Sequence, residues 1–361
     1  MLKKLKIFGF KSIREMKLEL KSLNVLIGAN GAGKSNFIDL LRLLKSLQNN
    51  QLQFYIGKAG GASSLLHYGA SVTSQMGARF DFNIDNTSIG YGVRFSDAPI
   101  DTLIFAEESL ESMQRQNLGM GHKEALFFNN QDVAYAALAQ KMRNEISKYG
   151  LFQFHDTSET AKMRGNCELH HNRYLMNDGS NLAAILYKLQ QTQLSYYERI
   201  VDTIQQIAPF FEDFILEPLA LNPNYIQLHW RSRNSTYEFG PHQLSDGTLR
   251  TMALITLLLQ PESDLPTLLV LDEPELGLHP YAITVITSLI RSASVHSQII
   301  LATQSSPFLD HFEATEIVVV EQQEGVSSFK RIESENLSAW LEEYSLSELW
   351  EKNVIGGRPC R

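Results

Sequence analysis

Residues 28–35 have the sequence Gly28-Ala29-Asn30-Gly31-Ala32-Gly33-Lys34-Ser35. They fit the pattern G-x-x-x-x-G-K-[ST], in which glycines let backbone N–H groups converge on one concavity. Such a concavity, followed by the N-terminus of a helix, binds phosphate oxygens. In this pattern the lysine reaches the outer phosphates of a nucleotide, and the serine hydroxyl binds Mg²⁺. We therefore predict a nucleotide site whose binding residues are Asn30, Gly31, Ala32, Gly33, Lys34, Ser35 and Asn36, with Ser35 also a metal ligand.

The residues on either side of this loop have the patterns of a strand and a helix. The apolar run 23–27 precedes the loop, at the end of residues 16–27, which we expect to contain one strand. After the loop, apolar residues recur at helical spacing from Phe37 to Leu47. Strand, glycine-rich loop and helix are the context that a phosphate-binding loop requires. A chance match to the pattern is therefore the weaker interpretation.

Two adjacent carboxylates follow a second apolar run. Residues 268–271 are Leu-Leu-Val-Leu, and Asp272 and Glu273 come next. A buried strand presents such residues at its carboxyl end, where ligands bind in open α/β sheets. We predict that Asp272 helps to hold Mg²⁺ and that Glu273 is catalytic, orienting or deprotonating the attacking water. Without the 28–35 loop, an ordinary strand ending in a charged turn would be the better interpretation.

A third motif is the 243–248 turn, Gln-Leu-Ser-Asp-Gly-Thr, which precedes a predicted helix at 248–260. Ser245, Gly247 and the free N–H groups at the start of that helix would form an anion site. A Ser-Asp-Gly turn is also a common helix cap. From the residues alone both interpretations stay open.

The remaining patterns indicate an α/β protein. Short alternating stretches within residues 77–112 predict an antiparallel sheet, and residues 111–211 are expected to be mainly helical, with the best helices at 132–149 and 181–207. A helix at 281–293 and a buried strand at 298–302 follow. Because strands and helices alternate at both ends of the chain, we expect a parallel or mixed core sheet with crossover helices.

Composition narrows the class of protein. The chain has 361 residues, 43% of them hydrophobic, and a net charge of −8. The basic excess typical of dedicated DNA binders is missing. The two cysteines form neither a disulfide framework nor a zinc-ligand cluster, and no run of eighteen apolar residues is present. We expect a cytoplasmic protein without a membrane span.

The three motifs, taken in this order, resemble the nucleotide-binding head of an ABC-type ATPase of the RecF, SMC and RecN group. The 243–248 turn is similar to the signature L-S-G-G-Q, with Asp246 in place of the first of the two glycines. Residues 5–12, Leu-Lys-Ile-Phe-Gly-Phe-Lys-Ser, resemble the first strand of the group, and the 274–280 segment, Pro-Glu-Leu-Gly-Leu-His-Pro, resembles the D-loop of RecF-like and OLD-type ATPases. Within the group the chain resembles stand-alone prokaryotic ATPases of antiphage defence islands, which are sometimes encoded beside a nuclease.

The resemblance implies ATP and Mg²⁺ as cofactors and a homodimer in which two heads enclose two ATP molecules head to tail. Ser245 and Gly247 would then touch the γ-phosphate of the nucleotide bound to the partner. Lys11, on the first strand, would reach a nucleotide phosphate, although a solvated strand lysine explains it equally well. Gln304 stands where the group often has a switch histidine. Because Gln304 cannot take up a proton, we expect it to act at the γ-phosphate in a slow ATPase.

The resemblance also implies a P-loop NTPase fold with an N-terminal antiparallel β subdomain and an inserted helical lobe. We expect the ATPase core in residues 1–110 and 215–333, the lobe in 111–214 and a helical tail in 334–361. The favoured function is an ATP-driven switch in DNA-linked work, most of all antiphage defence with a separate effector nuclease. The alternatives are a RecF-like repair protein that clamps duplex DNA itself and a slow or non-hydrolysing ATP sensor.

Overall fold

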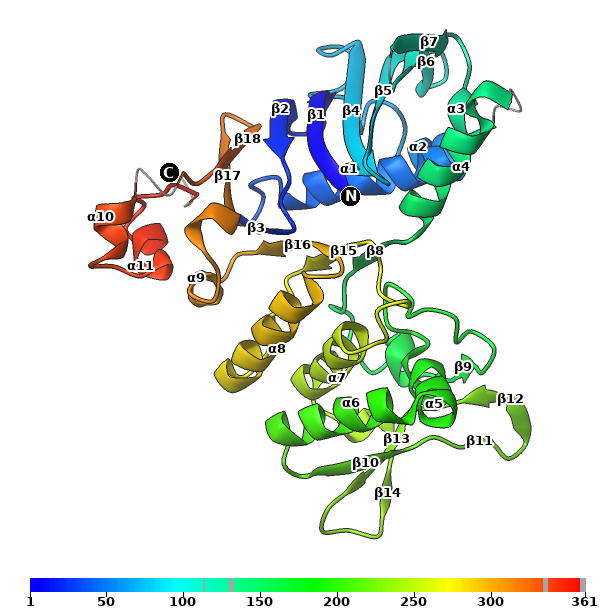
Figure 1. The fold of residues 1–361 in the computed structure, drawn as a ribbon, viewed down its shortest axis with the longest axis vertical. Coiled ribbons are helices and arrows are strands. Elements are labelled where there is room, and N and C mark those ends of the chain that lie inside the picture. The colour runs from blue at the N-terminus through cyan, green and yellow to red at the C-terminus, as the bar shows by residue number, and fades with distance from the viewer. Residues whose placement is uncertain (113, 130–132, 334–336, 358–361) are drawn as a thin grey trace. The chain divides into compact units, whose positions relative to one another are not determined.

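The computed structural model describes residues 1–112, 114–129, 133–333 and 337–357. The chain forms two compact units, labelled by element in Figure 1. Unit 1 consists of Met1–Tyr149 and Ile300–Arg361, and unit 2 consists of Gly150–Ile299. Unit 1 is therefore built from both ends of the chain, and unit 2 from its middle.

Unit 1 contains a six-stranded antiparallel sheet in the order β2-β1-β4-β5-β6-β7. In β1 and β4, buried and more exposed residues mostly alternate, as they do in a strand with one covered face. Leu5 lies opposite Leu18 on one side and Phe80 on the other, so apolar side chains share that face. The strands are β1 (Leu2–Phe10), β2 (Ile13–Glu19), β4 (Gln75–Ile84), β5 (Thr87–Ala98), β6 (Thr102–Glu111) and β7 (Arg115–Gly119). The predicted antiparallel sheet is confirmed.

A second sheet in unit 1 joins strands from the two ends of the chain. The strand β3 (Leu23–Ile27) pairs in parallel with β17 (Ile317–Gln323), and β17 pairs antiparallel with β18 (Val326–Arg331). On its other side β3 neighbours β16 (Gln298–Thr303), the strand at which the chain passes from unit 2 back to unit 1. All five residues of β3 are buried, as expected for a strand covered on both faces.

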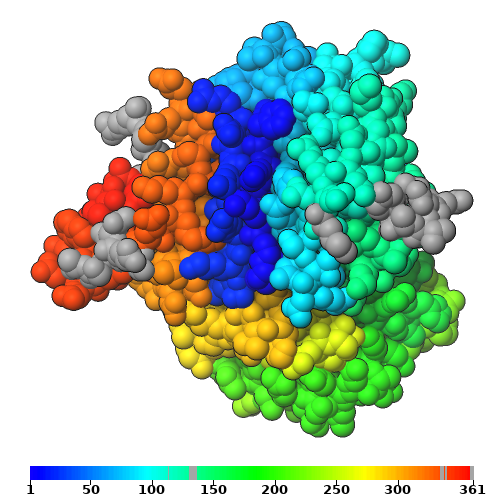
Figure 2. All heavy atoms as spheres, turned by 45° about the horizontal axis from the view of Figure 1, so that its top comes forward, coloured from blue at the N-terminus to red at the C-terminus, as the bar shows by residue number. Residues whose placement is uncertain are grey.

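The two ends of the chain lie side by side on the surface of unit 1. Figure 2 shows β1 and β2 as a blue band between the orange β17–β18 hairpin and the cyan strands that follow. β18 contacts β2, and β1 is hydrogen-bonded to β4, in agreement with that view. Residues far apart in the sequence are therefore neighbours at the loop that links β3 to the first helix.

The helices of unit 1 pack mainly through leucine and phenylalanine side chains. Helix α1 (Lys34–Gln48) buries one face that includes Phe37, Leu41 and Leu44. The others are α2 (Leu52–Lys58), α3 (Leu126–Asn129), α4 (Val133–Ser147), α9 (Ser306–Leu309), α10 (Ser338–Leu341) and α11 (Leu346–Glu351). Two parts of the predicted tail, 334–336 and 358–361, and residue 132 of a predicted helix lie outside the described residues.

A buried carboxylate orders the end of the antiparallel sheet. Glu108 is fully buried, and it accepts hydrogen bonds from the Tyr91 hydroxyl (2.8 Å) and His122 Nε2 (2.9 Å). It also accepts hydrogen bonds from the backbone N–H groups of Leu126 (2.8 Å) and Phe127 (3.0 Å). Burial, with the neighbouring Glu108 carboxylate, raises the pKa of Tyr91 well above its ordinary value, so the phenol remains a donor.

Unit 2 contains four longer helices and several short strands. The amphipathic helix α6 (Leu194–Ile207) buries Tyr197, Ile200, Val201 and Ile204, whereas α7 (Asp246–Leu258) is buried along most of its length. The other helices are α5 (Leu182–Thr192) and α8 (Pro280–Ala293). The strands are β8 (Tyr149–Phe152), β9 (Cys167–Glu168), β10 (Phe211–Ile215), β11 (Pro218–Leu219), β12 (Asn222–Ile226), β13 (His229–Ser232), β14 (Glu238–Phe239) and β15 (Leu268–Asp272).

The short strands of unit 2 form two antiparallel sheets, β10-β13-β14 and β11-β12-β9. Trp230 stacks on Phe239 across the first of them, with ring centroids 4.6 Å apart. The strand β15, whose first four residues are buried, has β8 as a hydrogen-bonded neighbour. The predicted strand at 268–271 is therefore a buried core strand.

Three predictions about the elements were wrong. Residues 16–27 form the end of β2 and all of β3, because the Asn24 side chain bonds both backbone groups of Lys21 and turns the chain. Residues 181–207 form α5 and α6, which pack against each other across a non-helical Gln193. Residues 111–211 also contain β7, β8 and β9 and long irregular stretches, in which the backbone forms isolated turns such as the one closed by Ala161 N–H and the Ser158 carbonyl oxygen.

Among the residues that the structure describes, no helix combines the length and the apolar character needed to span a membrane.

Glu108→Ala is expected to lower the free energy of unfolding by about 3 kcal/mol, because it leaves several buried donors without an acceptor. Glu107→Ala is the matched control: its carboxylate bonds Arg94 (3.1 Å) and Arg115 (2.6 Å), both of which have substantial solvent exposure. Surface pairs of that kind contribute about 0.5 kcal/mol. Urea denaturation followed by circular dichroism measures both changes, and equal losses would contradict the importance of the buried cluster.

Candidate functional site

The 28–35 loop connects β3 to α1 with the backbone conformation that its glycines allow. Gly31 and Gly33 have φ values of 79° and 118°, which side chains other than glycine rarely adopt. Gly33 is the N-cap of α1, and no side chain caps that helix end. The N–H groups at the start of α1 are therefore left for a ligand rather than for a capping side chain.

The loop rests closely on the β17–β18 hairpin. A Cβ atom on Gly28 would lie 2.2 Å from the Val320 carbonyl oxygen, and one on Gly33 would lie 2.3 Å from Ser327 Oγ. The hairpin also bonds the loop, because Ser327 Oγ donates to the Ala32 carbonyl oxygen at 2.6 Å. Only glycine fits at these two positions, so the glycine pattern of the sequence has a packing reason as well as a conformational one.

A relay of hydrogen bonds joins the first strand, α1 and the hairpin. Asn36 Nδ2 donates to Ser12 Oγ at 2.6 Å, and Ser12 Oγ lies 2.6 Å from Ser327 Oγ. Because Ser327 donates its proton to Ala32, Ser12 must donate to Ser327. Of the predicted binding residues, Asn36 therefore has a structural partner, which sequence reasoning did not anticipate.

Lys34 is buried, and its ammonium lies over the loop. Lys34 Nζ donates to the carbonyl oxygens of Gly28 (2.6 Å) and Ala29 (3.0 Å). These contacts hold the positive charge at the loop, while Asn30, Gly31 and Ser35 are exposed. The donors present, a lysine, a serine hydroxyl and uncapped backbone N–H groups, fit a phosphate group with a bound Mg²⁺.

Lys11 lies beside α1 in an unusual backbone conformation, with φ at 50°. Its ammonium forms an ion pair with Asp39, which also bonds Arg42 at 2.6 Å. His67 holds the backbone in place, since its Nδ1 lies 2.5 Å from the Lys11 carbonyl oxygen. A role of Lys11 at a phosphate remains a prediction, and it would require the Asp39 pair to loosen.

The predicted metal ligand Asp272 and the predicted catalytic Glu273 lie at the end of β15 in unit 2. Asp272 and Glu273 are half-buried, and Glu273 has φ at 45°, in the left-handed region. The following Pro274 disfavours the right-handed helical conformation at Glu273. The polypeptide therefore turns sharply where the sequence places the catalytic residue, a kind of strain that collects at functional sites.

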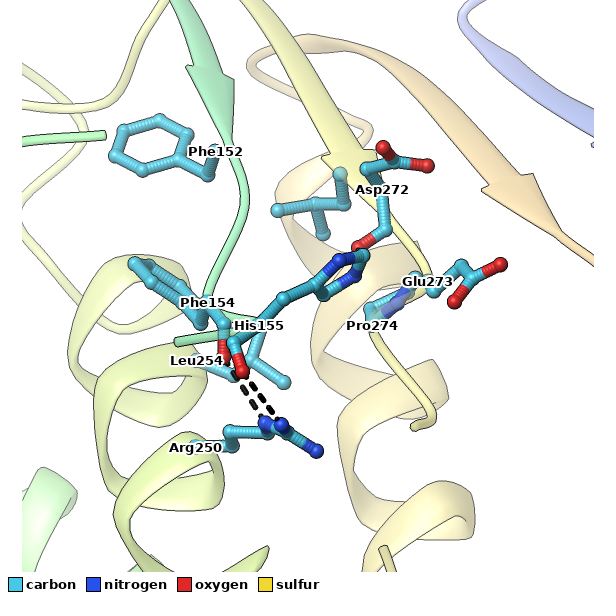
Figure 3. A pocket seen from close by; sticks show the side chains of 9 residues that line it. Phe152, Phe154, His155, Arg250, Leu254, Asp272, Glu273 and Pro274 are labelled. Atoms are coloured by element: carbon cyan, nitrogen blue, oxygen red, sulfur yellow. Dashed lines mark hydrogen bonds between the residues drawn. The ribbon is translucent and has the colours of Figure 1, made fainter. Parts of the chain in front are cut away.

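A histidine that the sequence analysis did not single out lies next to these carboxylates. Figure 3 shows His155 between Phe154 and Asp272, with its ring directed toward the Asp272 backbone. His155 Nε2 lies 3.0 Å from the Asp272 carbonyl oxygen, and Gln153 Nε2 lies 3.0 Å from His155 Nδ1. The neighbouring Asp156 bonds the backbone N–H and the hydroxyl of Ser158. The spacing in the sequence gave no signal for a contact across 117 positions.

The 243–248 turn is both a helix cap and an exposed surface. Ser245 Oγ accepts the Thr248 N–H at 3.2 Å and caps α7, yet Ser245 is exposed. Gly247 packs against the 274–280 segment, because a Cβ there would lie 2.5 Å from the Gly277 carbonyl oxygen. The capping interpretation describes the geometry, and anion binding by Ser245 and Gly247 remains a prediction.

Arg164 explains why aspartate replaces a glycine of the signature pattern. The Arg164 side chain is buried, and it donates to Asp246 Oδ1 (2.8 Å) and to the carbonyl oxygens of Thr157 (2.9 Å), Leu244 (3.1 Å) and Pro241. Asp246 thus anchors the turn to a buried guanidinium. The departure from the pattern has a structural partner in this chain.

Arg250, one turn into α7, joins three segments of unit 2. It donates to the carbonyl oxygens of Phe154 (2.9 Å), His155 (2.7 Å) and Leu276 (3.0 Å). The first two bonds are visible in Figure 3. The helix that follows the 243–248 turn is therefore fixed both to the His155 segment and to the 274–280 segment.

The structure distributes the remaining predicted residues between the two units. Gln304 follows β16 in unit 1 and is half-buried. Gln53 exchanges hydrogen bonds with Leu103, Lys123 and Thr102 inside unit 1, and Gln51 precedes α2. Gln153 follows β8, the neighbour of the strand that carries Asp272.

Comparison with known proteins identifies the family. Residues 23–310, most of the chain, match the family described as "AAA domain, putative AbiEii toxin, Type IV TA system". The chain belongs to this AAA-domain family. The match includes the 28–35 loop, the 243–248 turn and both carboxylates. No curated protein matches the chain.

Solved structures show the fold of this AAA-domain protein. An SMC head bound to the C-terminal winged-helix domain of ScpA has a TM-score of 0.59 and 17% identity, covering 94% of this chain and 99% of the other. An SMC head with an extended coiled coil, bound to the C-terminal domain of ScpA derived from Pyrococcus furiosus, has a TM-score of 0.59 and 15% identity, covering 95% and 98%. These matches show that the chain has the fold of an SMC head, and the predicted fold class, a P-loop NTPase fold with an N-terminal antiparallel sheet, is confirmed.

Arg164→Met is expected to destabilise unit 2 of this AAA-domain protein by about 3 kcal/mol, because buried carbonyl oxygens and Asp246 lose their donor. The control is Arg231→Met, since Arg231 is exposed on β13 and such changes stay within about 0.5 kcal/mol. Denaturant unfolding of each variant measures the difference. If Arg164→Met unfolds at the same denaturant concentration as the parent, the anchoring of the turn by Arg164 is wrong.

Proposed function

We propose that this chain hydrolyses ATP as a head-to-tail homodimer and works as a nucleotide-controlled switch for a separate effector. The observation that carries the proposal is the 28–35 loop, in which Lys34 is buried over the loop and the start of α1 has no side-chain cap. A loop of this conformation offers N–H groups and one ammonium to a polyphosphate. A nucleoside triphosphate has enough negative charge and enough phosphate oxygens to bind these N–H groups and the ammonium together.

The proposed chemistry assigns a task to each of five predicted residues. Lys34 binds the β- and γ-phosphates, and Ser35 and Asp272 hold Mg²⁺, which when bound neutralises charge on the phosphate oxygens. Glu273 orients or deprotonates the attacking water. Gln304 can donate a hydrogen bond to the γ-phosphate but cannot carry a proton. A slow turnover is therefore the expected behaviour.

A second copy of the chain would complete each site. Ser245 is exposed and Gly247 is half-buried at the start of α7, so both are accessible to a partner. In the proposed dimer these two residues contact the γ-phosphate bound by the partner's loop. Hydrolysis then removes the bridge between the two heads and opens the dimer.

The client of the switch is proposed to be a separate protein, and antiphage defence with an effector nuclease is the favoured setting. The sequence contains no recognisable nuclease motif, so cleavage would need another chain. The family description mentions a toxin of a type IV toxin–antitoxin system. Both SMC heads of similar fold were solved with a domain of ScpA bound. These points support a protein partner for a head of this fold.

Direct clamping of duplex DNA, as in RecF-like repair, is the second candidate. A groove of about 600 Å³ on the antiparallel sheet is lined by basic residues that include Lys6, Lys17, Arg79, Arg94 and Arg115. However, Arg79 pairs with Asp81 and Glu111, whereas Arg94 and Arg115 share Glu107. Paired arginines displace few phosphate counterions. The groove and the net charge of −8 therefore favour a protein client over DNA.

Steady-state ATP hydrolysis, with and without duplex DNA, tests the proposal. The parent chain is expected to turn over ATP slowly and independently of DNA, and Glu273→Gln to bind ATP but lose turnover by roughly 100-fold or more. Lys34→Ala is expected to lose ATP binding. Parental turnover in Glu273→Gln would exclude Glu273 as the base. Stimulation by DNA would favour the clamp, and ATP binding without any turnover would favour the sensor.

Ser245→Arg tests the dimer separately from nucleotide binding. In a Glu273→Gln background, ATP and Mg²⁺ are expected to double the molecular mass in solution, and the added Ser245→Arg change is expected to prevent this while ATP binding persists. Ser245→Ala, which keeps the small side chain, serves as the control for loss of the cap. A dimer that survives Ser245→Arg would remove the 243–248 turn from the interface.

A further inference from the structure

His155 is held on both sides by segments that carry functional residues. Its backbone carbonyl oxygen accepts a hydrogen bond from Arg250 of α7. Its ring bonds the Asp272 carbonyl oxygen at the end of β15. All of these residues belong to unit 2. Figure 3 shows the ring on the inner side of the turn, with the Asp272 and Glu273 carboxylates directed away from it.

The hydrogen bonds determine which nitrogen of His155 carries the proton. A backbone carbonyl oxygen can only accept, so Nε2 must donate to Asp272. In the neutral ring Nδ1 is then the acceptor, and the Gln153 amide donates to it at 3.0 Å. The chain of donors runs from Gln153 through His155 to Asp272 without conflict. Gln153 thereby fixes both the tautomer and the orientation of the ring.

The accepting oxygen belongs to the peptide group between Asp272 and Glu273. Fixing the plane of that peptide restrains the backbone of Glu273, whose φ of 45° is unfavourable for a side chain other than glycine. Such conformations persist only where the surroundings hold them. The hydrogen bond from the His155 ring therefore restrains the backbone that determines the direction of the Glu273 carboxylate.

We propose that His155 is a positioning residue that holds the Asp272–Glu273 peptide in the conformation required for hydrolysis. This inference rests on the proposed ATPase function. His155 takes no proton from the water and touches no substrate in this proposal. A displacement of about 1 Å at a reacting group can lower a rate about 100-fold, so the loss of this single bond is expected to act on turnover rather than on ATP binding.

Three substitutions of His155 separate the hydrogen bond from the shape of the ring. His155→Phe keeps a planar ring without the donor. In His155→Gln the amide nitrogen reaches about as far as Nε2, and in His155→Asn it is too short to reach Asp272. His170→Phe is the matched control, since His170 is an exposed histidine of the same unit.

The test measures kcat and KM for ATP, with Glu273→Gln as the blank and thermal unfolding as a check of folding. We expect kcat to fall about 10- to 100-fold in His155→Phe and His155→Asn, with KM changed by less than about threefold. His155→Gln is expected to retain most of the parental kcat, and His170→Phe all of it. If His155→Phe does not fold, the Gln and Asn variants carry the comparison.

Parental kcat in His155→Phe or His155→Asn would overturn the inference, and so would equal losses in the Gln and Asn variants. A raised KM with unchanged kcat would also overturn it, because the residue would then serve ATP binding. In all these cases the proposed function stands, provided that the parent shows turnover that depends on Glu273. Without such turnover the proposed function fails, and the inference fails with it.

Discussion

The close contact between the 28–35 loop and the β17–β18 hairpin is the constraint on which unit 1 depends. Gly28 and Gly33 have no room for a side chain against Val320 and Ser327, and Ser327 in turn bonds Ala32 and Ser12. Three segments of the chain, the segment of Ser12, the 28–35 loop and the β17–β18 hairpin, therefore meet here. A nucleotide site formed in this way depends on the C-terminal hairpin as much as on the glycine-rich motif, and the parallel pairing of β3 with β17 brings the two together.

Two arginines of unit 2, the buried Arg164 and the half-buried Arg250, serve a comparable purpose. Arg164 and Arg250 each donate several hydrogen bonds to backbone carbonyl oxygens of segments that would otherwise be loops. A guanidinium has five N–H donors in a fixed plane, so one side chain can hold several segments at once. Through Arg250 and His155, the helix that begins at the 243–248 turn is connected to the residues that carry the carboxylates. In a dimer with the proposed geometry, a displacement of that helix would therefore also displace the Asp272 and Glu273 carboxylates of the same chain.

Much of the fold, and the elements that carry the candidate site residues, could be predicted from the sequence, because they depend on local patterns. The apolar run before Gly28, the spacing of apolar residues in α1 and the four apolar residues before Asp272 each determine one element. The break at Gln193 and the turn at Lys21 could not be predicted, since each depends on packing or on a single side-chain bond. The contact of His155 could not be predicted for the same reason, because its partner is the backbone carbonyl oxygen of Asp272, which is far away in the sequence. Asp246, a departure from the signature pattern, is explained only by the buried Arg164.

Complementation between two inactive variants tests the central claim, a site shared by two chains, most directly. Lys34→Ala lacks the loop lysine, and Ser245→Arg blocks the contact with the partner, so each variant alone is expected to be inactive. In a mixture, the intact loop of one chain can meet the intact 243–248 turn of the other, and turnover should recover to about one quarter of the parental value in a two-fold symmetric assembly. A mixture that stays inactive, or a Ser245→Arg chain that hydrolyses ATP alone, would contradict the shared site.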